Sequence, residues 1–347
     1  MDLFVEPLRM ADEKPSMLHT MLHILNGDST ANLLKEAQVE GEVLVWREAL
    51  IAGATPEGVD KESWLNLRAR HLALAYDRNF DEVLSGLMEQ DAALGRLDKH
   101  NEIVLWFEHD LFCQTNLIYL LDHLSRCEPG GTVLSMICID RFPGRKDFRG
   151  LGELSSVEIG SLVYKRHEIS IEEKELGAKA WAAYCSSTPQ EIEDLLTRDT
   201  ASLPFLEPAL KKHLARFPST TNGLGRVENT ALELISGGAR DFASLFGAFG
   251  KEEPLYGYGD LQFLNDMRRL AHGKRPPVRI GELDENGDLG PVIPKLEFEL
   301  TDSGAAVLAA EEDFISENEV DFWLGGVHLT NQDHWRWNGE EMVHSVS

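Results

Sequence analysis

The sequence predicts an α/β protein with a Rossmann-like, mainly parallel sheet covered by helices on both faces. A helical connector and a C-terminal winged-helix-like domain are expected to follow. Three observations support this prediction. Four apolar runs alternate with helical segments in residues 17–150, which is typical of a parallel sheet. A chain of 347 residues exceeds the usual size of one hydrophobic core. Residues 223–313 contain three helical segments and then a hairpin pattern.

The first unit, residues 17–150, is predicted to repeat the order strand, turn, helix. Its strand candidates are short runs rich in β-branched and aliphatic residues. They are residues 18–25, 41–46, 102–107 and 132–139. Helical periodicity is found between and after them, at residues 30–37, 61–76, 81–94 and 111–124.

All four strand candidates end in polar side chains. Because the carboxyl ends of parallel strands share one edge of the sheet, where ligands of open α/β sheets bind, we expect these groups to converge. They are Asn26, Asp28 and Ser29; Arg47 and Glu48; Glu108, His109 and Asp110; and Asp140 and Arg141.

The third strand end is the most informative, because three ionisable residues in a row follow an apolar run. Glu108, His109 and Asp110 are therefore the candidate catalytic residues, with His109 as proton shuttle because imidazole titrates near neutral pH. Carboxylate oxygens suit a divalent cation, so Asp28, Glu48 and Glu108 are candidate metal ligands. The candidate substrate-binding residues are Asn26, Asp28, Ser29, Arg47 and Gln114.

Each strand end also has a purely structural interpretation. Asp28 or Ser29 would cap the helix that follows, and Arg47 with Glu48 would form a surface ion pair. Asp110 would likewise cap the next helix while its two neighbours face solvent.

Several classes of protein are disfavoured by the sequence. No predicted strand is followed by GxGxxG or GxxxxGK[ST], the nucleotide-binding loops. No apolar run is long enough to span a membrane and the N-terminus lacks a signal pattern, so we expect a cytoplasmic protein. The four cysteines show no CxxC pair and are expected to be reduced. A net charge of −26 disfavours broad nucleic-acid binding.

The second half divides into three parts. Residues 151–222 predict a helical connector, and residues 223–313 predict a winged helix, a fold whose third helix can enter a DNA groove. A basic strip near that helix comprises Arg268, Arg269, Lys274, Arg275 and Arg279, although acidic residues outnumber basic ones in the domain. Such domains also bind proteins. The aromatic tail, residues 314–347, is expected to dock on the body and close over the strand ends, with His328 or His334 reaching toward them.

The chain resembles an uncharacterised bacterial family whose N-terminal region is known as domain of unknown function 1835. The matching segments are residues 23–28, 45–50, 107–114 and 323–330. The resemblance covers most of the chain and draws attention to the same three strand ends, but it implies no particular reaction.

Two functions are compatible with these patterns. The first is an enzyme that binds a phosphorylated or nucleotide-like small molecule at the strand ends, such as a metal-dependent hydrolase or transferase acting on phosphoesters. The second is a ligand-sensing regulator whose winged helix contacts DNA or a protein partner.

Overall fold

The computed structural model describes residues 20–127, 130–146, 148–282 and 296–346. At its centre is a five-stranded sheet in the order β2-β1-β3-β4-β5, in which β1 to β4 are parallel and β5 is antiparallel. This mixed α/β architecture is compatible with the predicted Rossmann-like sheet. The strands are β1 (Met21–Leu25), β2 (Glu42–Val45), β3 (Glu102–Glu108), β4 (Val133–Ile139) and β5 (His167–Glu168).

The strand order reverses direction between β1 and β3. From β1 the chain runs outward to β2 and then crosses back to β3 on the other side of β1. In open α/β sheets such a switch point opens a crevice at the carboxyl ends of the two strands. The end of β1 and the end of β3 therefore border the place where a ligand is expected.

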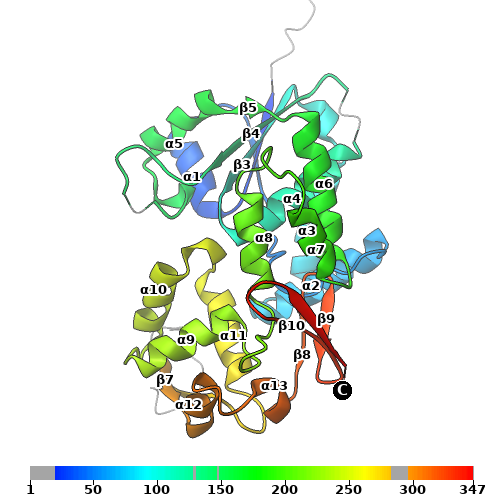
Figure 1. Ribbon diagram of the computed structural model, residues 1–347. Helices are drawn as coiled ribbons and strands as arrows, with labels where there is room; N and C mark the ends of the chain where they lie inside the picture. Colours follow the sequence, from blue (N-terminus) through cyan, green and yellow to red (C-terminus); the bar gives the residue numbers. More distant parts are fainter. Residues whose placement is uncertain (1–19, 128–129, 147, 283–295, 347) are drawn as a thin grey trace, which may run out of the picture.

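Helices cover both faces of the sheet, as Figure 1 shows. Val104 and Trp106 of β3 pack on one face beneath α1 and α5, whereas Leu105 and Phe107 pack on the other beneath α4. Because successive side chains of a strand point to opposite faces, this double burial explains the nearly continuous apolar run of β3. The covering helices are α1 (Asp28–Glu36), α5 (Ser156–Leu162), α4 (Leu111–Ser125) and α6 (Ile171–Cys185), which packs on α4.

A helical hairpin, α2 (Lys61–Ala75) and α3 (Phe80–Leu94), follows β2. Asp60 and Asn79 cap the two helices with their side-chain oxygens. Leu72 and Leu87 pack with Ala49, which attaches the hairpin to the segment after β2.

The predicted connector is not separate from the sheet. Helix α5 and strand β5 lie beyond residue 150 and complete the sheet and its cover. A strand of two residues is too short to show an alternating pattern, which explains why the sequence did not predict β5. The remaining connector helices are α7 (Gln190–Leu196) and α8 (Leu206–Leu214).

The C-terminal helical unit contains the expected three helices and an antiparallel strand pair, β6–β7. Phe263 and Phe298 are buried in its core. The turn predicted at residues 284–288 lies outside the described residues, and the winged-helix assignment stays a prediction. The elements are α9 (Arg226–Ser236), α10 (Phe242–Glu252), α11 (Asp260–Leu270), β6 (Val278–Glu282), β7 (Leu296–Leu300), α12 (Asp302–Leu308) and α13 (Phe314–Glu317).

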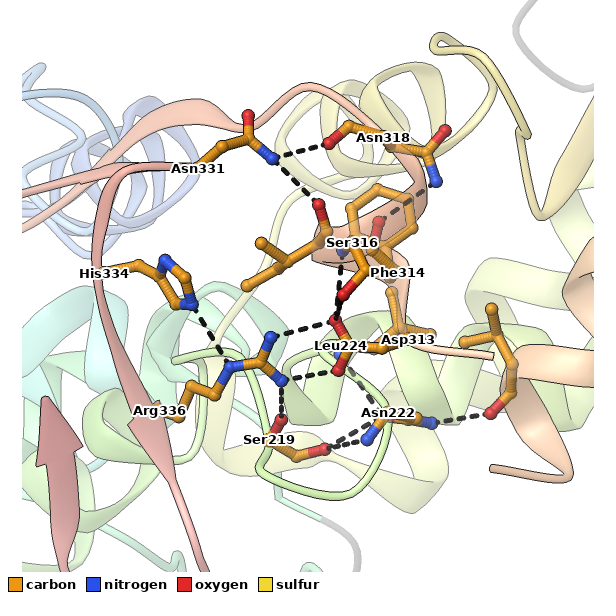
Figure 2. A network of polar contacts seen from close by, with 12 residues as sticks. Ser219, Asn222, Leu224, Asp313, Phe314, Ser316, Asn318, Asn331, His334 and Arg336 are labelled. Atoms are coloured by element: carbon orange, nitrogen blue, oxygen red, sulfur yellow. Dashed lines mark hydrogen bonds and ion pairs between the residues drawn. The ribbon is translucent and has the colours of Figure 1, made fainter. Parts of the chain in front are cut away.

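The tail forms two antiparallel hairpins that the sequence did not predict. Arg336 anchors the second hairpin through both oxygens of Asp313 and the carbonyl of Ser219, and it also donates to Nε2 of His334 in its own strand, as Figure 2 shows. The tail thus packs on the connector and on α13. The strands are β8 (Asp321–Leu324), β9 (Val327–Thr330), β10 (Asp333–Trp337) and β11 (Met342–Val346).

Short 3-10 helices complete the described structure. Two of them contribute to sites described below, because η2 follows β4 and η4 precedes α11. They are η1 (Leu97–Lys99), η2 (Leu151–Glu153), η3 (Val163–Lys165) and η4 (Pro254–Tyr256). Within the described ranges, no helix combines the length and the apolar character needed to cross a bilayer.

Candidate functional site

A small cavity of about 250 Å³ lies at the switch point of the sheet. Asn26 contributes from the end of β1, and Glu108 and Asp110 contribute from the end of β3. The strand ends therefore converge in part as expected. The other lining residues come from the start of α4 and from the turn before α11, namely Phe112, Cys113, Gly257, Gly259 and Gln262.

Glu108 ends β3 and is buried beside this cavity. Its carboxyl group accepts hydrogen bonds from the backbone N–H of Leu151 (2.8 Å) and from the thiol of Cys113 (2.7 Å). No Lys, Arg or His in the described residues forms an ion pair with it. Burial, and next the carboxyl group of Asp110, raise the pKa of Glu108 from 4.5 to about 7. Near neutral pH this group can both donate and accept a proton.

Asp110 has a structural role as well as a position in the cavity. It caps α4 by accepting a hydrogen bond from the backbone N–H of Cys113 (2.8 Å), so the capping interpretation of this residue is confirmed. Burial raises the pKa of Asp110 above its usual range. Glu108, by contrast, does not face solvent as that interpretation required.

The turn before α11 closes directly on Asp110. Gly257 has a φ of +64°, and a Cβ atom built at this position would lie 2.1 Å from Oδ1 of Asp110. Only glycine meets both conditions. The C-terminal helical unit is therefore in contact with the carboxyl pair.

Three polar side chains support the strand ends. Asn26 donates from Nδ2 to Sγ of Cys113 (3.2 Å), and Gln114 donates from Nε2 to the carbonyl of Glu108 (2.8 Å). Gln114 is buried with its amide on the backbone, an arrangement that positions Glu108. Burial raises the pKa of the Cys113 thiol, which keeps the thiol protonated and unsuited to act as a nucleophile.

His109 does not line the cavity. Side chains alternate along the strand end, and its ring packs edge-on against Phe205, with ring centres 6.1 Å apart. Nδ1 is buried and has no hydrogen-bond partner among the described residues. The structure therefore does not bring the predicted proton shuttle to the carboxyl pair.

Glu48 is committed to Arg68, a residue that the sequence analysis did not single out. Nε and Nη2 of Arg68 donate to the two carboxylate oxygens at 2.9 and 2.8 Å, and both side chains are buried. The other guanidinium hydrogen bonds go to the carbonyls of Ala49, Ala52 and Ala54. This ion pair fixes the loop after β2, so the alternative interpretation, in which Arg47 and Glu48 form a surface ion pair with each other, is wrong.

Arg47 instead pairs with Asp28 on the surface, at 2.6 Å from Nη2 to Oδ1. Helix α1 begins at Asp28, with Gly27 at the capping position and no side-chain cap, so the capping interpretation of Asp28 or Ser29 is wrong. Ser29 is exposed and donates to the carbonyl of Gly152 (3.4 Å).

A larger cavity of about 740 Å³ adjoins the small one, because Asn26 and Phe112 line both. Its volume is in the range of ligand sites. Its walls include three aromatic side chains and two arginines: Trp46, Tyr76, Phe112, Arg47 and Arg78.

The predicted metal set is not assembled. Asp28 binds Arg47, Glu48 binds Arg68, and Glu108 binds Leu151 and Cys113. The described part of the chain holds no group of three or more His, Cys, Asp or Glu side chains placed to bind a metal ion. These residues therefore do not fit the expected site.

The tail does not cover the carboxyl pair, because no described tail residue lines either cavity. His328 binds Asp321 at 2.7 Å, and His334 lies in the network of Arg336. Trp323 and Trp335 each stack on a histidine of the partner strand, with ring centres 4.5 Å apart. The expectation that the tail closes over the strand ends is wrong.

The basic strip is largely neutralised. Arg269 binds Glu228 and Asp266, Arg275 binds Glu312, and Arg279 binds Glu299. Helix α11 also docks on α2, where Asn265 donates to the carbonyl of Ala75 and Gln262 to the hydroxyl of Tyr76. Both features disfavour insertion of this helix into DNA.

No known family model matches the sequence, and no curated protein matches it either. The resemblance to the family with domain of unknown function 1835 therefore stays a prediction. These comparisons indicate no chemistry for the strand ends, so only the geometry of the strand ends indicates what they can do.

Proposed function

We propose that this protein is an enzyme that binds a nucleotide-like small molecule at the carboxyl ends of β1 and β3, with Glu108 as the acid-base group. One observation carries the proposal: Glu108 and Asp110 are buried together at the switch point and line a cavity, with no cation paired to Glu108 in the described residues. Keeping two carboxyl groups there costs stability, and such groups are concentrated at functional sites.

The two adjoining cavities favour a ligand with an aromatic part and a polar part. Trp46, Tyr76 and Phe112 offer surfaces against which a base-like ring can pack. Arg47 and Arg78 lie on the same walls and suit a phosphate group. Hydroxyl groups of the ligand would then face Glu108 and Asn26 in the small cavity.

The pKa of Glu108 suits general acid-base catalysis, because proton transfer by a side chain is most efficient when the pKa of that side chain is near the working pH. Asp110 is held by its capping hydrogen bond and keeps that pKa high. Cys113, Asn26 and Gln114 hold the carboxyl group in place. No metal ion takes part in this scheme.

The proposal is tested by thermal shift with the four common nucleosides and their 5′-monophosphates. We expect at least one of them to raise the melting temperature of the wild-type protein, since a ligand that binds only the folded state stabilises it. Glu108→Gln and Asp110→Asn should abolish the shift and still fold.

The matched control is Glu153→Gln, which changes an exposed carboxylate on the same edge of the sheet. We expect this variant to respond like the wild type. The proposal is wrong if no nucleoside or nucleotide shifts the wild-type protein, or if Glu108→Gln responds normally.

A second candidate is a ligand-sensing regulator, which the contact of Gly257 with Asp110 favours. For this function we infer that residues 223–313 form a winged-helix-like unit, supported by α9, α10, α11 and the β6–β7 pair. A ligand at the carboxyl pair would then press on the turn before α11. A gel shift with genomic fragments at moderate salt tests DNA contact: retardation that weakens in Arg268→Ala would support the regulator, and no retardation would contradict it.

A further inference from the structure

A second large cavity, of about 800 Å³, shares Gln262 with the pocket of the carboxyl pair and Tyr76 with the larger ligand cavity. Three parts of the chain enclose it: α2 from the sheet unit, α9 and α11 from the helical unit, and β8 from the tail. Nε2 of Gln262 donates to the hydroxyl of Tyr76 at 2.6 Å between the cavities. The proposed function does not use this space.

Arg216 lines this cavity and is only 7% exposed. Its guanidinium donates from Nη1 to the carbonyl of Ile51 (2.7 Å) and has a hydrogen bond with the hydroxyl of Tyr184, but it forms no ion pair among the described residues. The ring centre of Tyr258 lies 5.9 Å from its Cζ atom. Asp266, whose charge acts on Arg216, binds Arg269 instead.

Arg68, the other buried arginine among the described residues, shows what a structural guanidinium looks like in this protein. Arg68 makes five hydrogen bonds and a two-oxygen ion pair with Glu48. A buried cation without a carboxylate is costly, because its desolvation is not offset. Arg216 thus keeps donors for an anion that the chain itself does not supply.

Two further side chains of the cavity point the same way. Arg70 is exposed and also has no carboxylate partner among the described residues. His71 has a buried Nε2 atom without a partner in the described part of the chain. Burial, and next the charge of Arg68, lower the pKa of His71 to about 4, so this atom is available to a neutral polar group.

The aromatic lining suits the body of such a ligand. Tyr258, Phe322 and Trp323 all line the cavity. The carboxylates that line it have other partners: Glu228 and Asp266 share Arg269, and Asp321 binds His328. Oε2 of Glu228 has no hydrogen-bond partner among the described residues. Arg70 and Arg216 are therefore the two arginines of this lining that form no ion pair with a described carboxylate.

We propose that this cavity is a second binding site, for a small organic anion whose carboxylate or phosphate group binds Arg216 and whose aromatic or apolar body packs between Tyr258 and Trp323. Arg70 attracts the anion toward the cavity. Gln262 and Tyr76 also line the two cavities of the proposed nucleotide site. A ligand bound in this second site therefore acts on the walls of the nucleotide site.

The test is calorimetric titration of the full chain with phenyl phosphate and with benzoate, and with benzyl alcohol as the uncharged counterpart. We expect one anion to bind and benzyl alcohol not to bind. The anion that binds with the higher affinity shows whether the site prefers a phosphate or a carboxylate group. Arg216→Met should weaken binding by about tenfold or more, as expected for loss of a charge-assisted hydrogen bond. No binding of either anion to the wild-type protein would overturn the proposal.

Controls separate this site from the first one. The variants Glu108→Gln and Arg78→Gln should bind the anion with wild-type affinity. Arg216→Met should leave the binding of adenosine, which is uncharged, unchanged. Arg216→Met should fold, because it removes an unpaired charge. If it does not fold, Arg216→Lys and Arg70→Gln replace it, and unchanged affinity in both would contradict the proposal.

Discussion

Two buried carboxyl groups follow the strands on either side of β1, and they differ in what surrounds them. Glu48, after β2, is 6% exposed, and Glu108, at the end of β3, is 8% exposed. Arg68 neutralises Glu48 through two hydrogen bonds. Glu108 has a backbone N–H and a thiol instead.

Burial at a strand end therefore does not by itself identify a functional carboxyl group. With a cation bound to both oxygens, Glu48 serves as a structural anchor for the loop after β2. Without one, Glu108 keeps a raised pKa and a face on a cavity. Four substitutions test whether the surroundings of Glu48 and Glu108 give the two carboxyl groups these different roles.

The largest effect should come from removing the cation. Arg68→Met leaves Glu48 buried and unpaired, and we expect it to lower the free energy of unfolding by about 3 to 5 kcal/mol. Denaturant titration measures this. The double variant Glu48→Met with Arg68→Met should recover most of the loss. A loss below about 1 kcal/mol in the single variant would remove the structural role assigned to the pair.

Glu108→Gln, by contrast, should raise the free energy of unfolding at neutral and higher pH. The folded protein holds the Glu108 proton up to a pKa of about 7, whereas the unfolded chain releases it near 4.5. The stability contributed by this proton is therefore present at low pH and is lost as pH rises from 4.5 to 7. At pH 8 we expect the variant to be more stable, by on the order of 2 kcal/mol. If the free energy of unfolding changes with pH in the same way in the two proteins between pH 4 and 8, this prediction is contradicted.

The contact between the carboxyl pair and the helical unit is tested by Gly257→Ala. The added Cβ atom would collide with Asp110, and the φ of residue 257 is positive. We therefore expect the free energy of unfolding to fall by about 1 to 3 kcal/mol. Gly247→Ala in α10 is the matched control, because that position is exposed, helical and open. It should gain about 0.5 to 1 kcal/mol. Equal effects at the two positions would deny the close approach.

The smallest effect on stability should come from Arg47→Ala. Arg47 and Asp28 are 62% and 65% exposed, so their ion pair is screened by solvent and we expect a change within about 0.5 kcal/mol. Binding of a nucleoside monophosphate should nevertheless weaken more than binding of its nucleoside. Equal weakening of both would place the phosphate elsewhere.

The sequence predicted the parts of the fold that depend on local pattern. Four parallel strands, their polar ends and the capping role of Asp110 follow from alternation, turn residues and spacing. The hairpins of the tail also had a signal: Asp321 and Trp323 recur in the same spacing as Asp333 and Trp335. Each Trp stacks on a cross-strand histidine.

The site required contacts between distant segments. Glu48 and Glu108 look alike in sequence, because the partner of Glu48, Arg68, lies on α2, 20 residues further along the chain. Gly257 and Gln262 approach the strand ends from the other half of the molecule. Their only local trace is the glycine spacing before α11, which signals a close backbone approach but not its target.

The central claim is that Glu108 exchanges a proton near neutral pH. Its most direct test is a carbon-13 NMR titration of the side-chain carboxyl groups in protein labelled at glutamate, with Glu108→Gln used to assign the resonance. We predict a carboxyl signal that titrates near pH 7 and is missing from the variant. Titration of Glu108 at its ordinary value of 4.5 or below would contradict it.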